Sequence, residues 1–380
     1  MLINELPDDC LHAVFDYLND LDDLINCYKV CIKWNQLIAE RTKKNQRINE
    51  SQIFSDYPDY SSDCVYYQKK DFIDVTCLSK LFPNLMIADV SNIFHCKSNS
   101  KIEDIVSFVR NHESLKGIIN ASKERIEKYC DKLEMLSSGR IEPSILRNHC
   151  SLKQLHTLNY YQDFKRDAHY FPNLERLHIY IKGGYYAGPV LEKLKILELC
   201  LLYPHGVCYV TFQLMDSCPN LQSAHIFTPT NRFFVDETLK HKCLQDLVMS
   251  YGGPSCLDWN DLTRLFMKYP NLKHLSLRNV RYIKDEHIEQ LVQILPNLVL
   301  FDIYDCPAVT QRAADYVEDY CKRYGRLIKF YFEGNYHEIG TDWPQLSTKR
   351  EKISRGFDFM KNCFLKDFHH LPCFLIPEDY

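Results

Sequence analysis

The sequence predicts an α/β solenoid, a curved parallel sheet with outer helices, preceded by a small all-α module. Three observations predict it. A leucine-containing phrase recurs through most of the chain, the first forty residues carry a helical apolar stripe, and 380 residues are many for one compact core. Repeat arrays escape that size limit because each unit packs only on its neighbours.

The segment 6–38 predicts short helices. Pro7 suits the first turn of a helix, where its missing N–H costs nothing. Leu11, Val14, Phe15 and Leu18 then follow at helical spacing. Because about 40 residues bury too little apolar area to be very stable alone, we expect a partner to complete the burial of part of this surface.

The same segment resembles the F-box, whose pattern is Leu-Pro, an acidic pair, an apolar helix, a leucine opening the second helix, and Val-Cys-x-x-Trp. Here these are Leu6-Pro7, Asp8-Asp9 and, at 30–34, VCIKW. The resemblance implies docking onto the Skp adaptor, which links to a cullin. A helical hairpin that merely caps the repeats is the alternative. The implied adaptor-binding residues are Leu6, Pro7, Leu11, Phe15, Leu18, Leu24, Val30 and Trp34.

The recurring phrase is Leu-x-x-apolar-x-apolar. Its anchors recur at intervals of 20 to 29 residues, in or near the range of leucine-rich repeats. The last two apolar residues of the phrase are two apart, so they point the same way from a short strand, and equivalent strands form a parallel sheet. The segment 284–295 has the spacing of a returning helix. The anchors are Leu152, Leu174, Leu194, Leu221, Leu244, Leu272, Leu298 and Leu327.

The copy at 300–321 resembles the cysteine-containing repeat subtype common in F-box proteins, with Cys306 after the strand. It suggests that many of the 17 cysteines are small buried hydrophobes. We assign that structural role to Cys130, Cys150, Cys218, Cys243 and Cys306.

The patterns divide the chain into four parts. Residues 1–42 are the F-box, 43–80 a linker or degenerate first repeat, and 81–340 the leucine-rich-repeat solenoid. Residues 341–380 carry no repeat phrase but are too apolar for a free tail, so we expect them to cap the last repeat or to fold back across the solenoid.

The charge balance argues against some partners. Lys and Arg number 46 against 50 Asp and Glu, a net charge of −4, which predicts neither a nucleic-acid nor a membrane partner. The start MLINELPDDC does not resemble a signal peptide, and no apolar run is long enough to span a bilayer. We therefore expect a cytoplasmic or nuclear protein.

No motif predicts catalysis. The sequence lacks a P-loop and His-Glu-x-x-His, so we expect no catalytic residue and no cofactor. We expect no metal either, because Cys363, His369, His370 and Cys373 fit no zinc-ligand spacing.

Binding is the predicted role of the repeats. Residues between the apolar strand positions point to the concave face, and they are rich in the aromatic and arginine side chains typical of interfaces. Arg176 and Arg278 are the candidates for a phosphorylated partner. The predicted substrate-binding set is Arg176, His178, Tyr180, His225, Phe227, His274, Arg278, Tyr304 and Tyr331.

Together these features predict the substrate-recognition subunit of a Skp-cullin-F-box ubiquitin ligase, with an unknown protein substrate. A non-ligase interaction scaffold built on the same repeats is the alternative. A receptor whose surface is completed by a small molecule has no residue in its favour.

Overall fold

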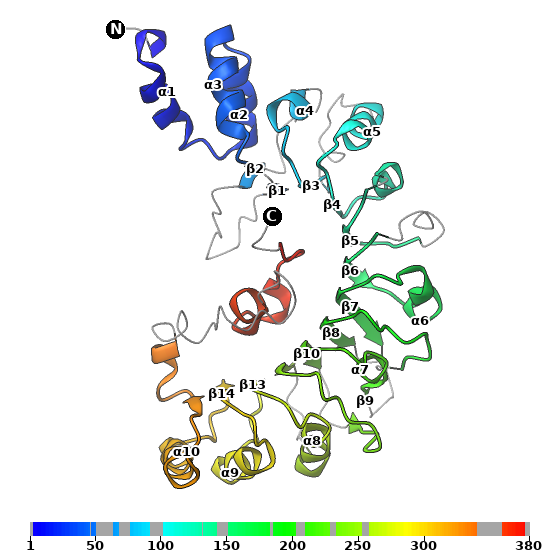
Figure 1. Cartoon of the computed structure of the whole chain (residues 1–380), viewed down its shortest axis with the longest axis vertical. Coiled ribbons are helices and arrows are strands. Elements are labelled where there is room, and N and C mark those ends of the chain that lie inside the picture. The colour runs from blue at the N-terminus through cyan, green and yellow to red at the C-terminus, as the bar shows by residue number, and fades with distance from the viewer. Residues whose placement is uncertain are drawn as a thin grey trace. The chain divides into compact units, whose positions relative to one another are not determined.

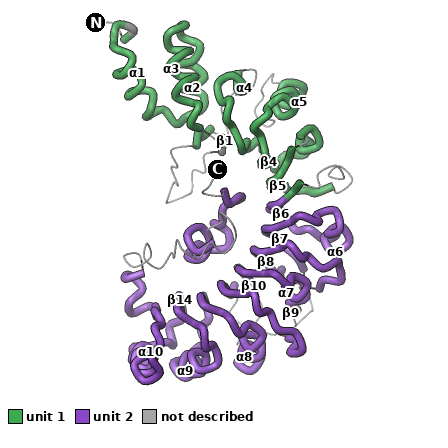
Figure 2. Tube along the Cα trace, viewed as in Figure 1, with its two compact units in different colours: residues 1–152 green, residues 153–380 purple. Residues whose placement is uncertain are grey.

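The computed structural model divides the chain into two compact units, unit 1 (Met1–Leu152) and unit 2 (Lys153–Tyr380), shown in Figure 2. The structure describes residues 3–45, 47–50, 64–67, 77–91, 102–130, 132–142, 151–182, 185–202, 210–228, 233–252, 258–339 and 359–376. Cys150, one of the cysteines assigned a structural role, lies outside these residues.

Unit 1 begins with three helices, α1 (Asp8–Phe15), α2 (Leu21–Tyr28) and α3 (Ile32–Thr42). Asp20 caps α2, because its Oδ1 accepts the backbone N–H groups of Asp22 at 3.0 Å and Asp23 at 3.1 Å. A short acidic side chain at this position satisfies N–H groups that have no partner inside the helix.

The three helices enclose a small apolar core. Phe15 and Trp34 meet edge to face with ring centroids 5.1 Å apart, and Leu11 and Leu24 are fully buried. Arg41, only 5% exposed, holds α3 to the end of α1. Its Nε donates to the Phe15 carbonyl at 3.1 Å, so the guanidinium caps a helix end that would otherwise lack donors.

Five short parallel strands follow in unit 1: β1 (Arg47–Glu50), β2 (Cys64–Tyr67), β3 (Ile87–Asp89), β4 (Gly117–Asn120) and β5 (Met135–Ser138). Their order is β5-β4-β3-β1-β2. The helical returns are α4 (Leu78–Leu81), α5 (Ile102–Asn111) and a 3₁₀ turn (Ile126–Tyr129). Since β1 and β2 lie inside 43–80, part of that stretch is paired strand.

Unit 2 contains a second run of parallel strands, in the order β15-β14-β13-β12-β10-β8-β7-β6. Their bounds are β6 (Gln154–Tyr160), β7 (Arg176–Lys182), β8 (Ile196–Leu202), β10 (Ser223–Thr228), β12 (Asp246–Tyr251), β13 (His274–Arg278), β14 (Leu300–Tyr304) and β15 (Lys329–Tyr331). A separate pair is formed by β9 (Val210–Thr211) and β11 (Phe233–Phe234).

Helices return on the outer side of this curved sheet, as Figure 1 shows for unit 2. They are α6 (Phe164–Asp167), α7 (Gln213–Asp216), α8 (Trp259–Phe266), α9 (Asp285–Ile294) and α10 (Gln311–Tyr324). The fold class is therefore the predicted one, a leucine-rich-repeat solenoid after a small all-α module. Seven anchors are buried: Leu152, Leu174, Leu194, Leu221, Leu244, Leu272 and Leu298.

The eighth anchor was wrong, because Leu327 is 88% exposed. Gly325 ends α10 in a left-handed conformation with φ 65°, and β15 is the end strand of the order, so among the described residues no repeat follows to cover Leu327. Cys243 was also predicted to be buried but is half-buried, whereas Cys218 and Cys306 are buried.

The described C-terminal residues, 359–376, lie against the inner side of the unit 2 sheet (Figure 1). They form one turn of π-helix (Met360–Phe364) and one of 3₁₀-helix (Phe368–His370). We call residues 359–376 the C-terminal segment. Its buried members are Phe359, Met360, Cys363, Phe364, Phe368, Leu371, Phe374 and Leu375. Residues 341–358 and 377–380, which belong to the same predicted part, lie outside the described residues.

Candidate functional site

The inner side of the unit 2 sheet carries aligned rows of polar residues. In the register of the parallel strands His156 pairs with His178, His178 with Glu198, and Glu198 with His225. The same row continues through Val248, Ser276, Asp302 and Tyr331. Because side chains two apart share a face, Arg176 and Tyr180 flank His178 on this side. Repetition of one phrase in register therefore gathers residues that lie far apart in sequence.

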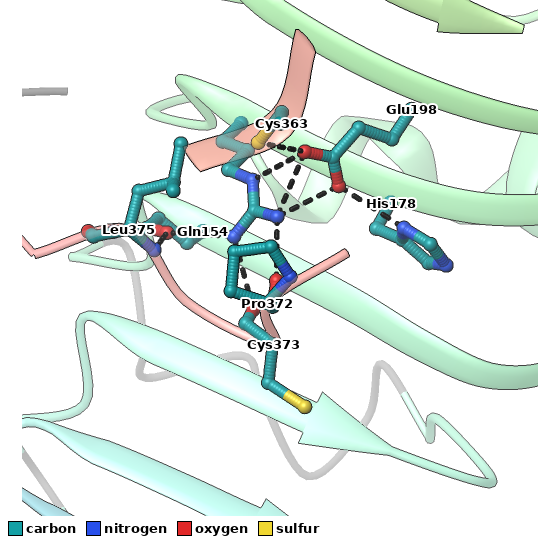
Figure 3. Close-up of polar contacts among 8 residues, drawn as sticks. Gln154, His178, Glu198, Cys363, Pro372, Cys373 and Leu375 are labelled. Carbon is teal, nitrogen blue, oxygen red and sulfur yellow. Dashed lines mark hydrogen bonds and ion pairs between the residues drawn. The ribbon is translucent and has the colours of Figure 1, made fainter. Parts of the chain in front are cut away.

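The centre of this face is an ion pair between Arg176 and Glu198, drawn in Figure 3. The Arg176 Nη2 donates to both Glu198 oxygens, at 2.8 and 2.7 Å, and its Nε donates to Oε1 at 3.1 Å. The exposed fraction is 1% for the Arg176 side chain and 0% for that of Glu198. A fully buried pair is stable only when its remaining hydrogen-bonding groups are satisfied.

The C-terminal segment satisfies them (Figure 3). Arg176 donates to the carbonyls of Pro372 at 2.7 Å and Cys373 at 3.1 Å. The Cys363 thiol lies 3.4 Å from Glu198 Oε1. Gln154 exchanges two hydrogen bonds with the Leu375 backbone, donating to its carbonyl at 2.6 Å and accepting from its N–H at 2.9 Å. The C-terminal segment therefore supplies hydrogen-bond partners to the buried ion pair, and the ion pair in turn holds the segment on this face.

The ionisation states follow from burial and this pairing. Burial alone raises the pKa of the Glu198 carboxyl, but the Arg176 guanidinium and His178 outweigh it and hold that pKa at about 2. Burial lowers the pKa of His178 and lowers that of His156 well below its ordinary value. The two imidazoles stack with centroids 4.1 Å apart, and His178 Nδ1 lies 3.0 Å from Glu198 Oε2. The cluster is thus an ionised carboxylate and guanidinium beside two neutral histidines.

A second arginine holds the other part of the segment. Arg278, also 1% exposed, donates through Nη1 to the Lys366 carbonyl at 2.7 Å and through Nη2 to the Phe364 carbonyl. Its Nε donates to Ser276 Oγ at 2.9 Å, and Ser276 donates to Asp302 Oδ2 at 2.7 Å. Burial raises the pKa of the Asp302 carboxyl, and Arg278 partly offsets that effect.

Four ring side chains, His178, Tyr180, His225 and Phe227, form an aromatic box around Phe368 of the C-terminal segment. The Phe368 ring stacks on His178 at 4.7 Å between centroids. The Phe368 ring lies edge to face against Tyr180 and His225, with centroids 5.7 Å apart in each pair. It is tilted against Phe227, with centroids 6.1 Å apart. Such aromatic contacts add to the energy of burial.

The nine residues predicted to bind a substrate therefore surround the C-terminal segment or line the same face. Arg176, His178, His225, His274, Arg278 and Tyr331 are buried, Tyr180 and Phe227 are half-buried, and Tyr304 is 41% exposed. His274 contacts Asp246, with Nδ1 2.6 Å from Oδ1. The sequence reasoning missed Gln154, although its place in register with Arg176 could have revealed it. As substrate-binding residues the nine remain a prediction.

The eight predicted residues of the helical module in unit 1 fall into three groups by exposure. Leu11, Phe15, Leu24 and Trp34 are buried in its core, Leu6 and Leu18 are half-buried, and Pro7 and Val30 are exposed. A buried core residue cannot contact a partner directly, so the first group acts by shaping the module. The eight predicted residues do not include the exposed apolar residues Ile3, Val14, Tyr17 and Ile32, although Val14 belongs to the predicted helical stripe.

The exposed apolar residues include a group at one end of the module. Lys33 Nζ donates to the Leu6 carbonyl at 3.0 Å and pairs with Asp8 at 2.9 Å. These contacts bring the start of α1, with exposed Pro7, beside the start of α3. Val30, 55% exposed, and Ile32, 81% exposed, adjoin that point.

Among the described residues, no three His, Cys, Asp or Glu side chains are grouped so as to hold a metal ion. No helix in the described parts of the chain is long and apolar enough to cross a membrane.

Comparison with known proteins identifies the first module. The F-box-like family profile matches residues 3–43, which contain α1 to α3. A search of curated proteins finds no match. The chain is thus a repeat protein with an N-terminal helical module. More particularly, it carries an F-box-like domain at its N-terminus and a leucine-rich-repeat solenoid behind it.

Two solved structures are similar at low identity. One is the TLR13 chain of a TLR13–ssRNA13 complex, with 16% identity and a TM-score of 0.41, covering 73% of this chain and 47% of that one. The chain thus spans about half the length of the TLR13 chain. The other is from the yeast Rad7–Elc1 complex, with 14% identity and a TM-score of 0.31, covering 80% of this chain and 90% of that one.

Proposed function

We propose that the chain is the substrate-recognition subunit of a Skp-cullin-F-box ubiquitin ligase. The F-box-like domain docks the Skp adaptor, which links the chain to a cullin in the cytoplasm or nucleus. The observation that carries the proposal is the apolar surface at one end of this domain, where Ile32 is 81% and Val30 55% exposed beside exposed Pro7. Exposed apolar residues gathered on so small a domain support a protein partner.

In this role the chain performs no chemistry of its own. The adaptor and cullin hold a ubiquitin-conjugating enzyme, and unit 2 holds a protein substrate. Binding both in one assembly raises the effective concentration of a substrate lysine at the enzyme, which replaces a bimolecular encounter by a local one. The receptor therefore raises the rate of ubiquitin transfer only by holding the substrate lysine near the enzyme.

The direct test is binding of the full chain to a purified Skp adaptor, measured by co-elution and calorimetry. Ile32→Asp places a charge on the exposed surface without disturbing the core, so we expect it to weaken adaptor binding at least about tenfold, the effect of losing one interface anchor. Gln36→Asp, on an exposed position of the same helix, is the matched control. Equal adaptor affinity in wild type and a folded Ile32→Asp variant would remove this surface from the proposal.

A non-ligase scaffold is the second candidate. The observation in its favour is that the C-terminal segment covers part of the inner face of unit 2. Reconstitution with adaptor, cullin and a ubiquitin-conjugating enzyme separates the two candidates. A bound partner that acquires ubiquitin supports the receptor, and one that binds stably without modification supports the scaffold.

A further inference from the structure

The C-terminal segment is an imperfect ligand for the face that it covers. His225 is fully buried, yet neither of its ring nitrogens has a hydrogen-bond partner among the described residues. Burial lowers the pKa of His225 well below its ordinary value, so its neutral ring has one donor and one acceptor nitrogen. The Phe368 ring of the segment lies edge to face against His225. Asp302 Oδ1 is likewise buried without a partner among these residues. A ligand with polar groups at these positions would bind better.

The two arginines bind the segment mainly through its main-chain carbonyls, and Arg278 also pairs with the Asp367 side chain, its Nη1 lying 3.8 Å from Oδ1. Within the segment, Arg176 donates to the carbonyls of Pro372 and Cys373, and Arg278 to those of Phe364 and Lys366. Every residue carries a main-chain carbonyl, so a peptide of another sequence that adopts this backbone shape can present them. Side chains are selected by the aromatic box, which surrounds Phe368, and by the pairing of Arg278 with Asp367.

We propose that the aromatic box, together with Arg176 and Arg278, is a peptide-recognition site, and that the C-terminal segment occupies it as an intramolecular competitor. Its other ligand is a segment of a partner protein that carries an aromatic side chain flanked by unpaired main-chain carbonyls. That partner half rests on the proposed function, in which unit 2 binds a protein substrate. Because the competitor is tethered, it acts at an effective concentration on the order of millimolar, and a partner must displace it.

The test uses the full chain and a fluorescent synthetic peptide of residues 359–376, with the same peptide carrying Phe368→Ala as its control. The wild-type chain is occupied by its own segment, so it should bind the labelled peptide weakly. The full chain with Phe368→Ala loses the side chain that fills the box. We expect this variant to bind the labelled peptide at least about tenfold more tightly than the wild-type chain does. We expect the variant and the wild-type chain to bind the control peptide equally weakly.

Hydrogen exchange over β7, β8 and β10 shows whether this variant keeps its sheet. Equal affinity of the two chains for the labelled peptide would overturn the proposal, as would equal binding of the two peptides to the variant. A second protein removes any dependence on the folding of the variant. It is the otherwise unchanged full chain with a protease site placed between residues 341 and 357.

After cleavage of this second protein, its own segment is no longer tethered, and we expect the labelled peptide to exchange into the site. Failure to exchange would show that the segment is a permanent part of the core, and would overturn the proposal. Adaptor binding is measured on the same samples. A chain that binds adaptor but exchanges no peptide refutes this inference alone, whereas a chain that exchanges peptide but binds no adaptor refutes the proposed ligase role.

Discussion

Replacing Glu198 by Gln tests the energetic role assigned to the buried ion pair. Gln keeps the size of the side chain but leaves the Arg176 guanidinium, 1% exposed, without its counter-charge. The pKa of Glu198 is about 2 against an ordinary value of 4.5. At about 1.4 kcal/mol per pKa unit, this difference corresponds to stabilisation on the order of 3 kcal/mol. Removing one partner of a buried pair costs roughly 3–5 kcal/mol, a similar magnitude. We therefore expect unit 2 to lose about 3 kcal/mol.

Hydrogen-exchange mass spectrometry of peptides from β7 and β8 measures this loss for unit 2 without a contribution from unit 1. The matched control is Glu175→Gln, at the residue directly before β7. Glu175 is 27% exposed and pairs with Lys195 at 3.1 Å. A partly exposed pair of this kind contributes at most about 1 kcal/mol. If Glu198→Gln costs no more than Glu175→Gln, the reasoning about the buried pair is refuted.

The same pair predicts a pH dependence with a definite sign. The pKa of Glu198 is lower in the folded chain than its ordinary value of 4.5. Its contribution is therefore complete above about pH 4.5 and is lost as the pH falls through about 2. Urea denaturation at pH values from 6 to 2 should show a decline in stability of the wild type across that window that is reduced in Glu198→Gln. Parallel declines in the two proteins would contradict the assignment.

Three further changes test local features of the fold, each by the denaturation midpoint and hydrogen exchange. Arg41→Met removes the donors to the carbonyls of Phe15 and Leu18 and should destabilise the F-box-like domain by roughly 1–3 kcal/mol, and a loss confined to unit 2 would contradict this. Gly325→Ala, at φ 65°, should cost roughly 1 kcal/mol from backbone strain alone, since no atom lies within 4 Å of the added Cβ; an unchanged midpoint would argue against it. Asp258→Ala removes the side chain that caps α8 and should cost about 1 kcal/mol, measured as faster exchange in the first turn of that helix.

The fold could be predicted from sequence because its signal is local and repeated. The Leu-x-x-apolar-x-apolar phrase fixes which side chains of each strand are buried, and parallel register then aligns His178 with Glu198 and Glu198 with His225. Leu327 shows the limit of that reasoning. The phrase is present there, but the anchor needs a following repeat to cover it, and sequence pattern alone does not reveal that the array has ended.

The sequence left open whether the C-terminal part caps the last repeat or folds back across the solenoid. Its contacts with the inner face could not be predicted, because they join residues about 200 positions apart. Arg176 meets the carbonyls of Pro372 and Cys373, and a carbonyl carries no sequence signal. In the F-box-like domain the difficulty was different. The family motif joins core residues such as Trp34 with surface residues such as Val30, so it identifies the domain without separating those that fold it from those that contact a partner.

The central claim is that this chain connects a cullin-bound adaptor to a protein partner, and one measurement addresses it directly. The full chain is mixed with a Skp adaptor and the adaptor-binding part of a cullin, and the mass of the eluting complex is determined by light scattering. The account predicts a 1:1:1 complex for the wild-type chain and a free chain for the folded Ile32→Asp variant. A wild-type chain that elutes alone, with its sheet intact by hydrogen exchange, would contradict it.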